Sequence, residues 1–263
     1  MKYFKTVKGW VVVAHLFVFI SCQSDPNHGS QKANNELTLD SAEVVLNKVI
    51  SAYGGGYTEL QVAFRFREFL YTVSEGDGGF RYTRSFTDTA SASIMDIYTN
   101  SSFERIRSGK IDRITPEKAK AYSNSINSVV YFALLPYKLR DPAVVKEYKG
   151  LSHIKCKAYH TLKVTFTEEG GGEDHDDEFY YWINSDDSKM DYLAYRYHTE
   201  GGGIRFRERI RTHTLSNAML LQDYTNYKTD SLLIDLSQLP AMFEAGALVA
   251  LSKIEIEDPR IIN

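Results

Sequence analysis

The sequence predicts an α+β fold in which a strongly curved antiparallel sheet, or incomplete β-barrel, of about ten strands wraps a buried helix. Residues 179–227 give the first reason, because aromatic and β-branched runs alternate there with short polar or Gly-rich turns, as in an antiparallel meander. Earlier runs with an apolar residue at every second position give the second reason. The third is a helical segment that begins near Thr115 and is apolar almost all round in its second half.

Residues 1–21 have the pattern of a secretory signal peptide. Three Lys precede an apolar run over residues 10–20, which is too short for a comfortable membrane span. The sequence "FISC" at residues 19–22 resembles a bacterial lipobox, with Phe at the position that Leu usually holds. We therefore expect lipidation of Cys22; the alternative is an ordinary secretory signal with an incidental Cys.

Residues 22–39 are polar and rich in Asn and Ser, which predicts a flexible tether. We expect residues 40–263 to form a single antiparallel-sheet domain with covering helices. The predicted protein is exported and is an outer-membrane lipoprotein, on the periplasmic face or the cell surface. Its partner is then the membrane, which it binds through the lipid anchor at Cys22.

The charge and the motifs exclude several functions. Residues 1–21 carry three Lys and no acid, so the mature chain is three units more negative than the formal charge of −3 of the whole sequence. An acidic chain argues against nucleic-acid binding. The sequence has no phosphate loop and no nucleophile elbow, so we expect no cofactor, no catalytic residue and no enzymatic activity. A dispersed active site gives no such motif, which leaves a hydrolase-like enzyme as one alternative.

The first predicted element is a helix from Asp40, with Glu43 three residues on and Gly54 at its end. Alternating runs then predict four strands, at residues 59–70, 80–87, 93–99 and 102–108.

The next helix begins at Thr115, which precedes Pro116 and Glu117 in the order of an N-cap, a first-turn Pro and an acidic first turn. It ends at Pro136. Beyond it we expect one more helical turn at residues 141–148 and a hairpin at 150–166. The meander follows, then one or two short helices and a last strand near residues 254–256.

Five passages carry a resemblance to a known family, at residues 121–150, 159–172, 181–184, 191–208 and 223–228. In these passages the chain resembles the uncharacterised bacterial lipoproteins grouped as domain-of-unknown-function family 6503. That family has no established activity, so the resemblance implies no catalytic residue. Its strand pattern is similar to that of Lol-type lipoprotein carriers, in which an incomplete barrel holds acyl chains beneath a helical lid.

Residues 204–211 place four Arg on one face of a predicted strand and apolar residues on the other. Guanidinium rows suit phosphate or carboxylate groups, so Arg205 and Arg207 are expected to bind an anionic headgroup if that edge rims a cleft. The interpretation that we favour for the row is a solvated face whose Arg pair with Asp and Glu across strands. Glu208 falls on the apolar face, where a carboxylate must be paired, hydrogen-bonded or protonated.

Two groups of residues are candidates for a metal site. His160, His198 and His213 lie on different predicted strands, and acidic residues crowd the loop at 168–178. Neither group has the close spacing of a zinc site or the alternation of a calcium loop. We therefore predict hydrogen-bonded His, a solvated hairpin tip and no metal.

The aromatic content points to a binding function. The sequence contains 18 Tyr and 14 Phe, and strands near residues 179–182 and 192–197 are apolar on both faces, so a helix or a ligand must cover each face. We predict a protein that binds or carries an amphipathic or acyl-bearing ligand, such as a lipid, in a cleft between sheet and helix. The expected ligand-binding residues are Tyr181, Trp182, Tyr195, Tyr197, His198, Arg205, Arg207 and Glu208. The alternative is an envelope protein-interaction module with a filled core.

Overall fold

The structure is a computed structural model, and it describes residues 39–167, 177–198 and 201–262. By its internal contacts the chain divides into Met1–Ala33 and Asn34–Asn263, and every element below belongs to the second unit. The predicted signal peptide, the tether with Cys22 and most of the acidic loop lie outside the described residues. Within the described ranges, no helix has the length and the apolar character needed to cross a membrane.

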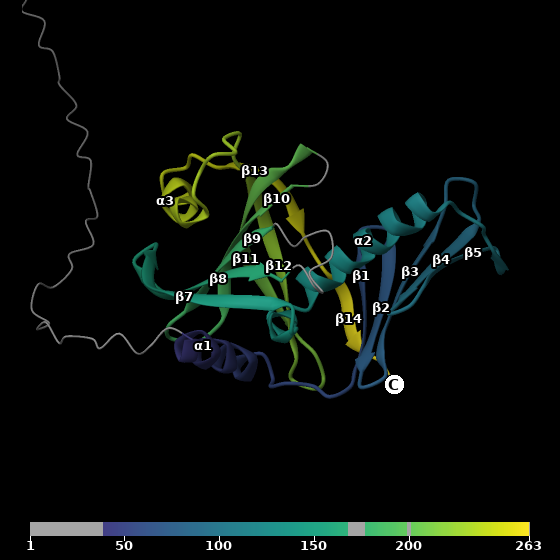
Figure 1. Cartoon of the computed structure of the whole chain (residues 1–263), viewed down its shortest axis with the longest axis horizontal. Helices are drawn as coiled ribbons and strands as arrows, with labels where there is room; N and C mark the ends of the chain where they lie inside the picture. The colour runs from purple at the N-terminus through teal and green to yellow at the C-terminus, as the bar shows by residue number, and fades with distance from the viewer. Residues whose placement is uncertain (1–38, 168–176, 199–200, 263) are drawn as a thin grey trace, which may run out of the picture. The chain divides into compact units, whose positions relative to one another are not determined.

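The described strands form two antiparallel sheets of seven strands each (Figure 1). Sheet A contains β1 (Leu60–Phe66), β2 (Phe69–Gly76), β3 (Gly79–Thr87), β4 (Ser93–Thr99), β5 (Phe103–Arg107), β6 (Lys110–Ile111) and β14 (Glu257–Ile261). Sheet B contains β7 (Val144–Ile154), β8 (Lys157–Phe166), β9 (Glu178–Asn184), β10 (Met190–Tyr197), β11 (Gly203–Thr214), β12 (Leu220–Lys228) and β13 (Val249–Ile254). The spatial orders are β14–β1–β2–β3–β4–β5–β6 and β13–β12–β11–β10–β9–β8–β7.

Helices are few, and they lie against these sheets. They are α1 (Leu39–Ala52), α2 (Pro116–Ala133), α3 (Leu239–Glu244) and the short 3-10 helices η1 (Tyr137–Arg140) and η4 (Leu236–Gln238). Helix α1 packs on β7, while α2 packs on β3, β4 and β5 of sheet A (Figure 1). The last turn of α2 also reaches sheet B, where the Phe132 ring lies 5.0 Å from the Tyr195 ring. Helix α2 therefore contacts both sheets.

Helix α2 begins as the sequence predicts. The Thr115 side chain caps it by accepting a hydrogen bond from the backbone N–H of Lys118, which satisfies one of the free donors of the first turn. Its buried residues, Ile126, Val130 and Ala133, are spaced by four and three positions and so share one face. The helix lies on the sheets with that face buried, and the sheets do not surround it.

Two cores stabilise the described unit. The larger core joins α1 and the two sheets, with Leu46, Phe64 and Leu162 among its members. The smaller core lies on the other face of sheet B, where Trp182 and Leu239 belong to it. Successive residues of a strand point to opposite faces, so sheet B is covered on both faces, as its aromatic strands predict. Below, the inner face of sheet B is the face that carries Tyr181, Leu193 and Arg207, and the outer face carries Trp182, Ala194 and Phe206.

The predicted fold class is confirmed: antiparallel sheets with few helices form an open, curved arrangement and not a closed barrel. The described strands number fourteen, more than predicted. Residues 59–70 are not one strand but parts of β1 and β2, because Arg67, with φ of 56°, turns the chain between them.

Two further sequence predictions differ from the structure. The helical turn predicted at residues 141–148 is wrong, because Val144 pairs with Phe166 and starts β7. Cross-strand pairing thus overrides the local preference. The last predicted strand is two strands, β13 and β14, which belong to different sheets.

Candidate functional site

Arg207 of β11 is the centre of the candidate site. Arg207 is paired with Leu193 of β10 on one side and with Asn226 of β12 on the other. Directly opposed residues of an antiparallel pair share a face. Leu193 belongs to the larger core, so Arg207 points into the protein. Only 7% of the residue is exposed, and its guanidinium carbon lies 3.9 Å from the centre of the Phe132 ring of α2.

The polar contacts of Arg207 are incomplete. Its Nη2 donates a hydrogen bond of 2.8 Å to the Tyr195 hydroxyl, but its buried Nε has no partner, and neither has the buried Oδ1 of Asn226. Buried polar groups are rarely left in this state, because each unmade hydrogen bond costs about 1–3 kcal/mol. Arg207 and Asn226 therefore have hydrogen-bonding capacity available for a polar ligand.

Arg205 repeats this arrangement two residues earlier. Its Nη2 donates to the Tyr197 hydroxyl at 2.7 Å, and its Nη1 donates to the Ile204 carbonyl at 2.9 Å. Among the described residues no carboxylate forms an ion pair with Arg205 or Arg207. We define the arginine–tyrosine cluster as Arg205, Arg207, Tyr195 and Tyr197.

The other two arginines of β11 differ, because both are paired with acids. Arg209 lies 2.5 Å from an Asp191 oxygen, and Arg211 lies 3.4 Å from Asp223 and 3.5 Å from Glu255. The pairing with acids that the sequence favours is therefore present for Arg209 and Arg211 and absent for Arg205 and Arg207. The solvated position is correct for Arg211 but not for Arg209, whose side chain is only 26% exposed. The half of the strand nearest the "EGGG" turn carries two positive charges that no described acid balances.

Aromatic side chains of the inner face and of α2 surround the cluster. Phe179 stacks on Tyr195 with ring centres 5.5 Å apart, and the hydroxyls of Tyr131 and Tyr181 lie 2.9 Å apart. Burial, with the neighbouring Tyr131 as a lesser cause, raises the pKa of Tyr181 well above 10.0. Tyr181 therefore stays neutral at physiological pH, and the surroundings are apolar with a few hydroxyl groups.

Three predicted site residues lie away from the cluster. Trp182 is on the outer face, where its ring centre is 5.8 Å from that of Phe206. Glu208 is also on that face, and it pairs with Lys155 at 2.8 Å and accepts a hydrogen bond from Tyr227 at 3.2 Å. It is thus paired, as the sequence argument requires.

His198 follows β10 with its side chain 56% exposed and 3.2 Å from an Asp177 oxygen. The structure thus brings together five of the predicted residues, which are Tyr181, Tyr195, Tyr197, Arg205 and Arg207.

Three residues beside the cluster were not predicted from the sequence: Tyr131, Phe132 and Asn226. Tyr131 and Phe132 stand in the predicted helix, but no local signal shows which strand the helix meets. Asn226 does carry a signal, because it alternates with buried Tyr224 on β12 and so occupies an inward position.

The His residues that were weighed as metal ligands have separate partners. His160 contacts the Tyr148 hydroxyl at 2.9 Å, and His213 contacts Asp223 at 2.9 Å. In the part of the chain that the structure describes, His, Cys, Asp and Glu form no group of three or more that could hold a metal ion.

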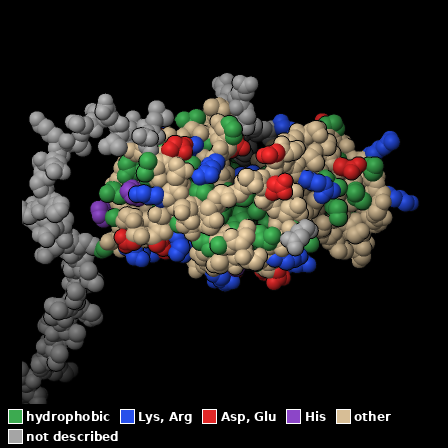
Figure 2. All heavy atoms as spheres, turned by 90° about the horizontal axis from the view of Figure 1, so that it is seen from below, with side chains coloured by type: hydrophobic (Ala, Val, Ile, Leu, Met, Phe, Trp, Pro, Cys, Tyr) green, Lys and Arg blue, Asp and Glu red, His purple; other side chains and the backbone are tan. Residues whose placement is uncertain are grey.

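The face drawn in Figure 2 carries no large patch of side chains that all have the same sign of charge. Lys and Arg side chains are interspersed there with Asp and Glu, and apolar side chains gather near the centre (Figure 2). On this face, neighbouring charges of opposite sign reduce each other's field at a distance.

Comparison with known proteins gives a family match and distant structural likenesses. The sequence matches the family described as "Family of unknown function (DUF6503)" over residues 15–257. No protein with a curated description matches it.

Three solved structures are similar to the chain, each with low sequence identity and a TM-score below 0.5. A LolA superfamily protein from Nitrosomonas europaea has 12% identity and a TM-score of 0.44, over 84% of this chain and 94% of that one. A Vibrio parahaemolyticus domain named for outer-membrane lipoprotein sorting has 7% identity and a TM-score of 0.40, over 71% and 86%. A DUF1329 family protein from Desulfovibrio piger has 8% identity and a TM-score of 0.38, over 84% and 92%.

Proposed function

The chain belongs to this DUF6503 family of unknown function, and we propose that it is an envelope lipoprotein that binds an amphipathic ligand with an anionic headgroup. The ligand lies between the inner face of sheet B and the C-terminal half of α2. One observation carries the proposal: Arg205 and Arg207 have no described acid partner, whereas Arg209 and Arg211 of the same strand have one. A buried cation is costly unless an anion balances it.

The headgroup is placed at Arg207. The free Nε of its guanidinium is buried, and a carboxylate or phosphate oxygen is the acceptor that such a group binds most strongly. Arg205, two residues away on the same face, adds a second positive charge. The Oδ1 of Asn226 accepts a hydrogen bond from a headgroup hydroxyl or from a bridging water.

The apolar part of the ligand is placed against the aromatic residues beside the cluster. Phe132 of α2 lies over both Arg207 and Tyr195, and Phe179 continues this surface along β9. Such a site is greasy with a few polar groups at fixed positions, which is typical of small-molecule pockets. The ligand enters by displacing the Phe132 side chain, because that ring covers the guanidinium.

We test this with the full chain and the fluorescent fatty acid cis-parinarate. Arg207→Gln removes the charge, and we expect it to weaken probe binding by about tenfold or more. The matched control is Arg211→Gln on the same strand, whose guanidinium pairs with acids, and its effect should stay within about twofold. Arg205→Gln provides a second variant at a half-buried position. If wild type does not bind the probe, or if Arg207→Gln and Arg211→Gln behave alike, the filled-core interaction module replaces this proposal.

The anchor is proposed at Cys22, and with it a place on the outer membrane. The support is the basic start of the chain, the apolar run and the Ser-Cys junction. Labelled fatty acid should enter the protein in cells, and Cys22→Ala should abolish the labelling. Equal labelling of both proteins excludes a lipid at Cys22.

A further inference from the structure

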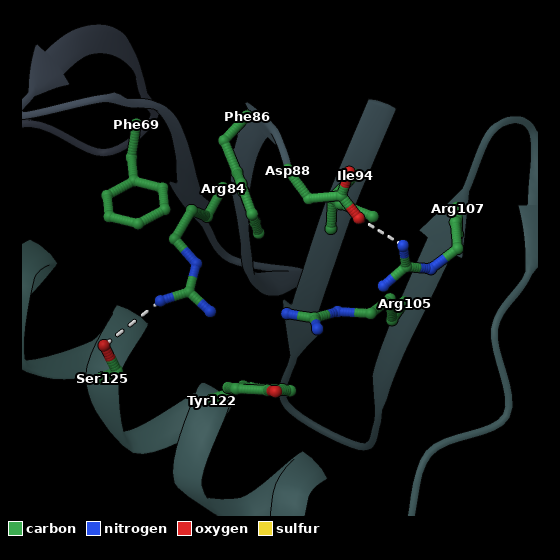
Figure 3. A pocket seen from close by; sticks show the side chains of 9 residues that line it. All are labelled: Phe69, Arg84, Phe86, Asp88, Ile94, Arg105, Arg107, Tyr122 and Ser125. Carbon is green, nitrogen blue, oxygen red and sulfur yellow. Dashed lines mark hydrogen bonds and ion pairs between the residues drawn. The ribbon is translucent and has the colours of Figure 1, made fainter. Parts of the chain in front are cut away.

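A cavity of about 400 Å³ lies under the middle of α2, between the helix and strands β2 to β5 of sheet A. Its apolar walls are Phe69, Phe86, Ile94 and Tyr122 (Figure 3). A volume of this size falls within the range of about 300–1,000 Å³ for small-molecule sites. The cavity faces sheet A, whereas the arginine–tyrosine cluster is on sheet B.

Two buried arginines supply the charge of this cavity. Arg84 and Arg105 are opposite Asp96 in the register of β3, β4 and β5. Asp96 is fully buried, and its oxygens lie 2.7 Å from Arg84 Nη2 and 2.6 Å from Arg105 Nε. Two guanidinium groups that share one carboxylate leave one positive charge in excess. The hydrogen bonds to Asp96 raise the pKa of Arg105, so that group stays charged.

The guanidinium groups face the cavity. Figure 3 shows Arg84 and Arg105 pointing toward one another above the Tyr122 ring. The guanidinium carbon of Arg105 lies 3.9 Å from the centre of that ring. The Nη1 of Arg84 donates to the Ser125 hydroxyl at 3.2 Å. Asp96 accepts from Nε and Nη2 of Arg105, which leaves the Nη1 of Arg105 outside that bidentate pair.

The charges at the rim of the cavity balance each other. Arg107 is exposed there and pairs with Asp88, which also lines the cavity, and with Asp112, which lies outside the lining. The positive charge in excess therefore comes from Arg84 and Arg105 inside the cavity. One positive charge in excess favours a ligand with a single negative charge.

We propose that this cavity is a second ligand site, which binds a small organic carboxylate with a flat apolar body. The carboxylate lies at Arg84 and Arg105, and the apolar body lies against Phe69, Phe86 and Tyr122. The proposal does not rest on the function assigned to sheet B, because the two sites have different strands, different arginines and different residues of α2.

The test uses the full chain and two probes of equal shape, 1-naphthoate and the neutral 1-naphthamide, titrated by calorimetry and ligand-observed NMR. We expect 1-naphthoate to bind with a Kd below about 1 mM and 1-naphthamide to bind about tenfold more weakly. Ser125→Trp, at an exposed helix position that lines the cavity, should weaken 1-naphthoate binding by about tenfold or more. Asn127→Trp, exposed on the same helix away from the lining, should change it by less than about twofold.

Further variants separate the two sites. Arg207→Gln should leave 1-naphthoate binding within about twofold of wild type, and Ser125→Trp should do the same for cis-parinarate. Tyr122→Ala checks the cavity a second time, by removing the ring under Arg105. The proposal is overturned if 1-naphthoate does not bind at about 1 mM, if 1-naphthamide binds equally well, or if Arg207→Gln rather than Ser125→Trp abolishes 1-naphthoate binding.

Discussion

The guanidinium carbon of Arg207 on β11 lies 3.9 Å from the centre of the Phe132 ring on α2. This contact joins the last turn of the helix to the inner face of sheet B, where Arg207 is buried and Phe132 is partly buried. A desolvated cation–π pair stabilises by about 2 kcal/mol. The same contact covers the unpartnered Nε of Arg207, so it links the stability of the helix to the proposed binding site.

A double-mutant cycle measures this link. Phe132→Leu, Arg207→Met and the double variant are compared with wild type by urea unfolding. We expect a coupling free energy of about 1–2 kcal/mol between the two positions. A coupling below about 0.3 kcal/mol means that the ring and the cation contribute independently, which contradicts the account of the contact.

Two adjacent glycines after α1 should respond differently to alanine. Gly54 has φ of 97°, and a Cβ there would lie 2.5 Å from the Ala218 carbonyl oxygen, whereas at Gly55, with φ of 86°, a Cβ meets open space. We expect Gly55→Ala to lower the free energy of unfolding by about 1–2 kcal/mol from its left-handed backbone alone. Gly54→Ala should cost about 1–3 kcal/mol more, because the backbone at Ala218 must move. Equal losses in thermal unfolding refute this close approach.

Asp96→Asn should be strongly destabilising. It leaves the buried guanidinium groups of Arg84 and Arg105 without a counter-charge, a change that costs about 3–5 kcal/mol in comparable buried pairs. The matched control is Asp88→Asn at the rim of the same cavity, which should cost less than about 1 kcal/mol because its partner Arg107 is exposed. Calorimetric unfolding of the two variants measures both losses of stability. A small loss for Asp96→Asn shows that the arginines do not depend on that carboxylate.

Stability should fall at acid pH through Glu75. Burial by itself would raise the pKa of this carboxyl group, but the charge of Lys138 and hydrogen bonds from Lys138, Tyr82 and Tyr57 bring it below its ordinary value of 4.5. A lowered folded-state pKa stabilises the protein at pH values above 4.5, and that stabilisation is lost as pH falls through the folded-state pKa.

Unfolding of wild type and Glu75→Gln between about pH 3 and pH 7 checks this point. The advantage of wild type should be greatest at the upper end and should shrink as the solution becomes acid. An advantage that grows toward acid pH has the wrong sign for a lowered pKa.

The sequence predicts local structure well where one strand or one helix carries the signal. The Thr115 cap and the meander of β9 to β12 follow from residue order and alternation, and both are present in the structure. Alternation also separates Arg205 and Arg207 from Phe206 on β11. Alternation does not tell which face of the strand is buried. That inference requires a single core on one face, whereas sheet B has a core on each of its faces.

The cavity of sheet A could not be predicted from any single strand. Arg84, Asp96 and Arg105 stand on three strands, and only the register of β3, β4 and β5 brings them together. Register depends on turn geometry and on pairing between distant segments, which one sequence does not show. The same holds for Phe132 over Arg207, which depends on where α2 lies on the sheets.

The most direct test of the central claim is native mass spectrometry of the full chain, purified from its own envelope, with lipid extraction alongside. We expect wild type to carry a copurified amphipathic anion, Arg207→Gln to lose most of it and Arg211→Gln to keep it. A wild-type protein that carries no small molecule and binds no cis-parinarate contradicts the proposal that Arg207 binds an anionic headgroup.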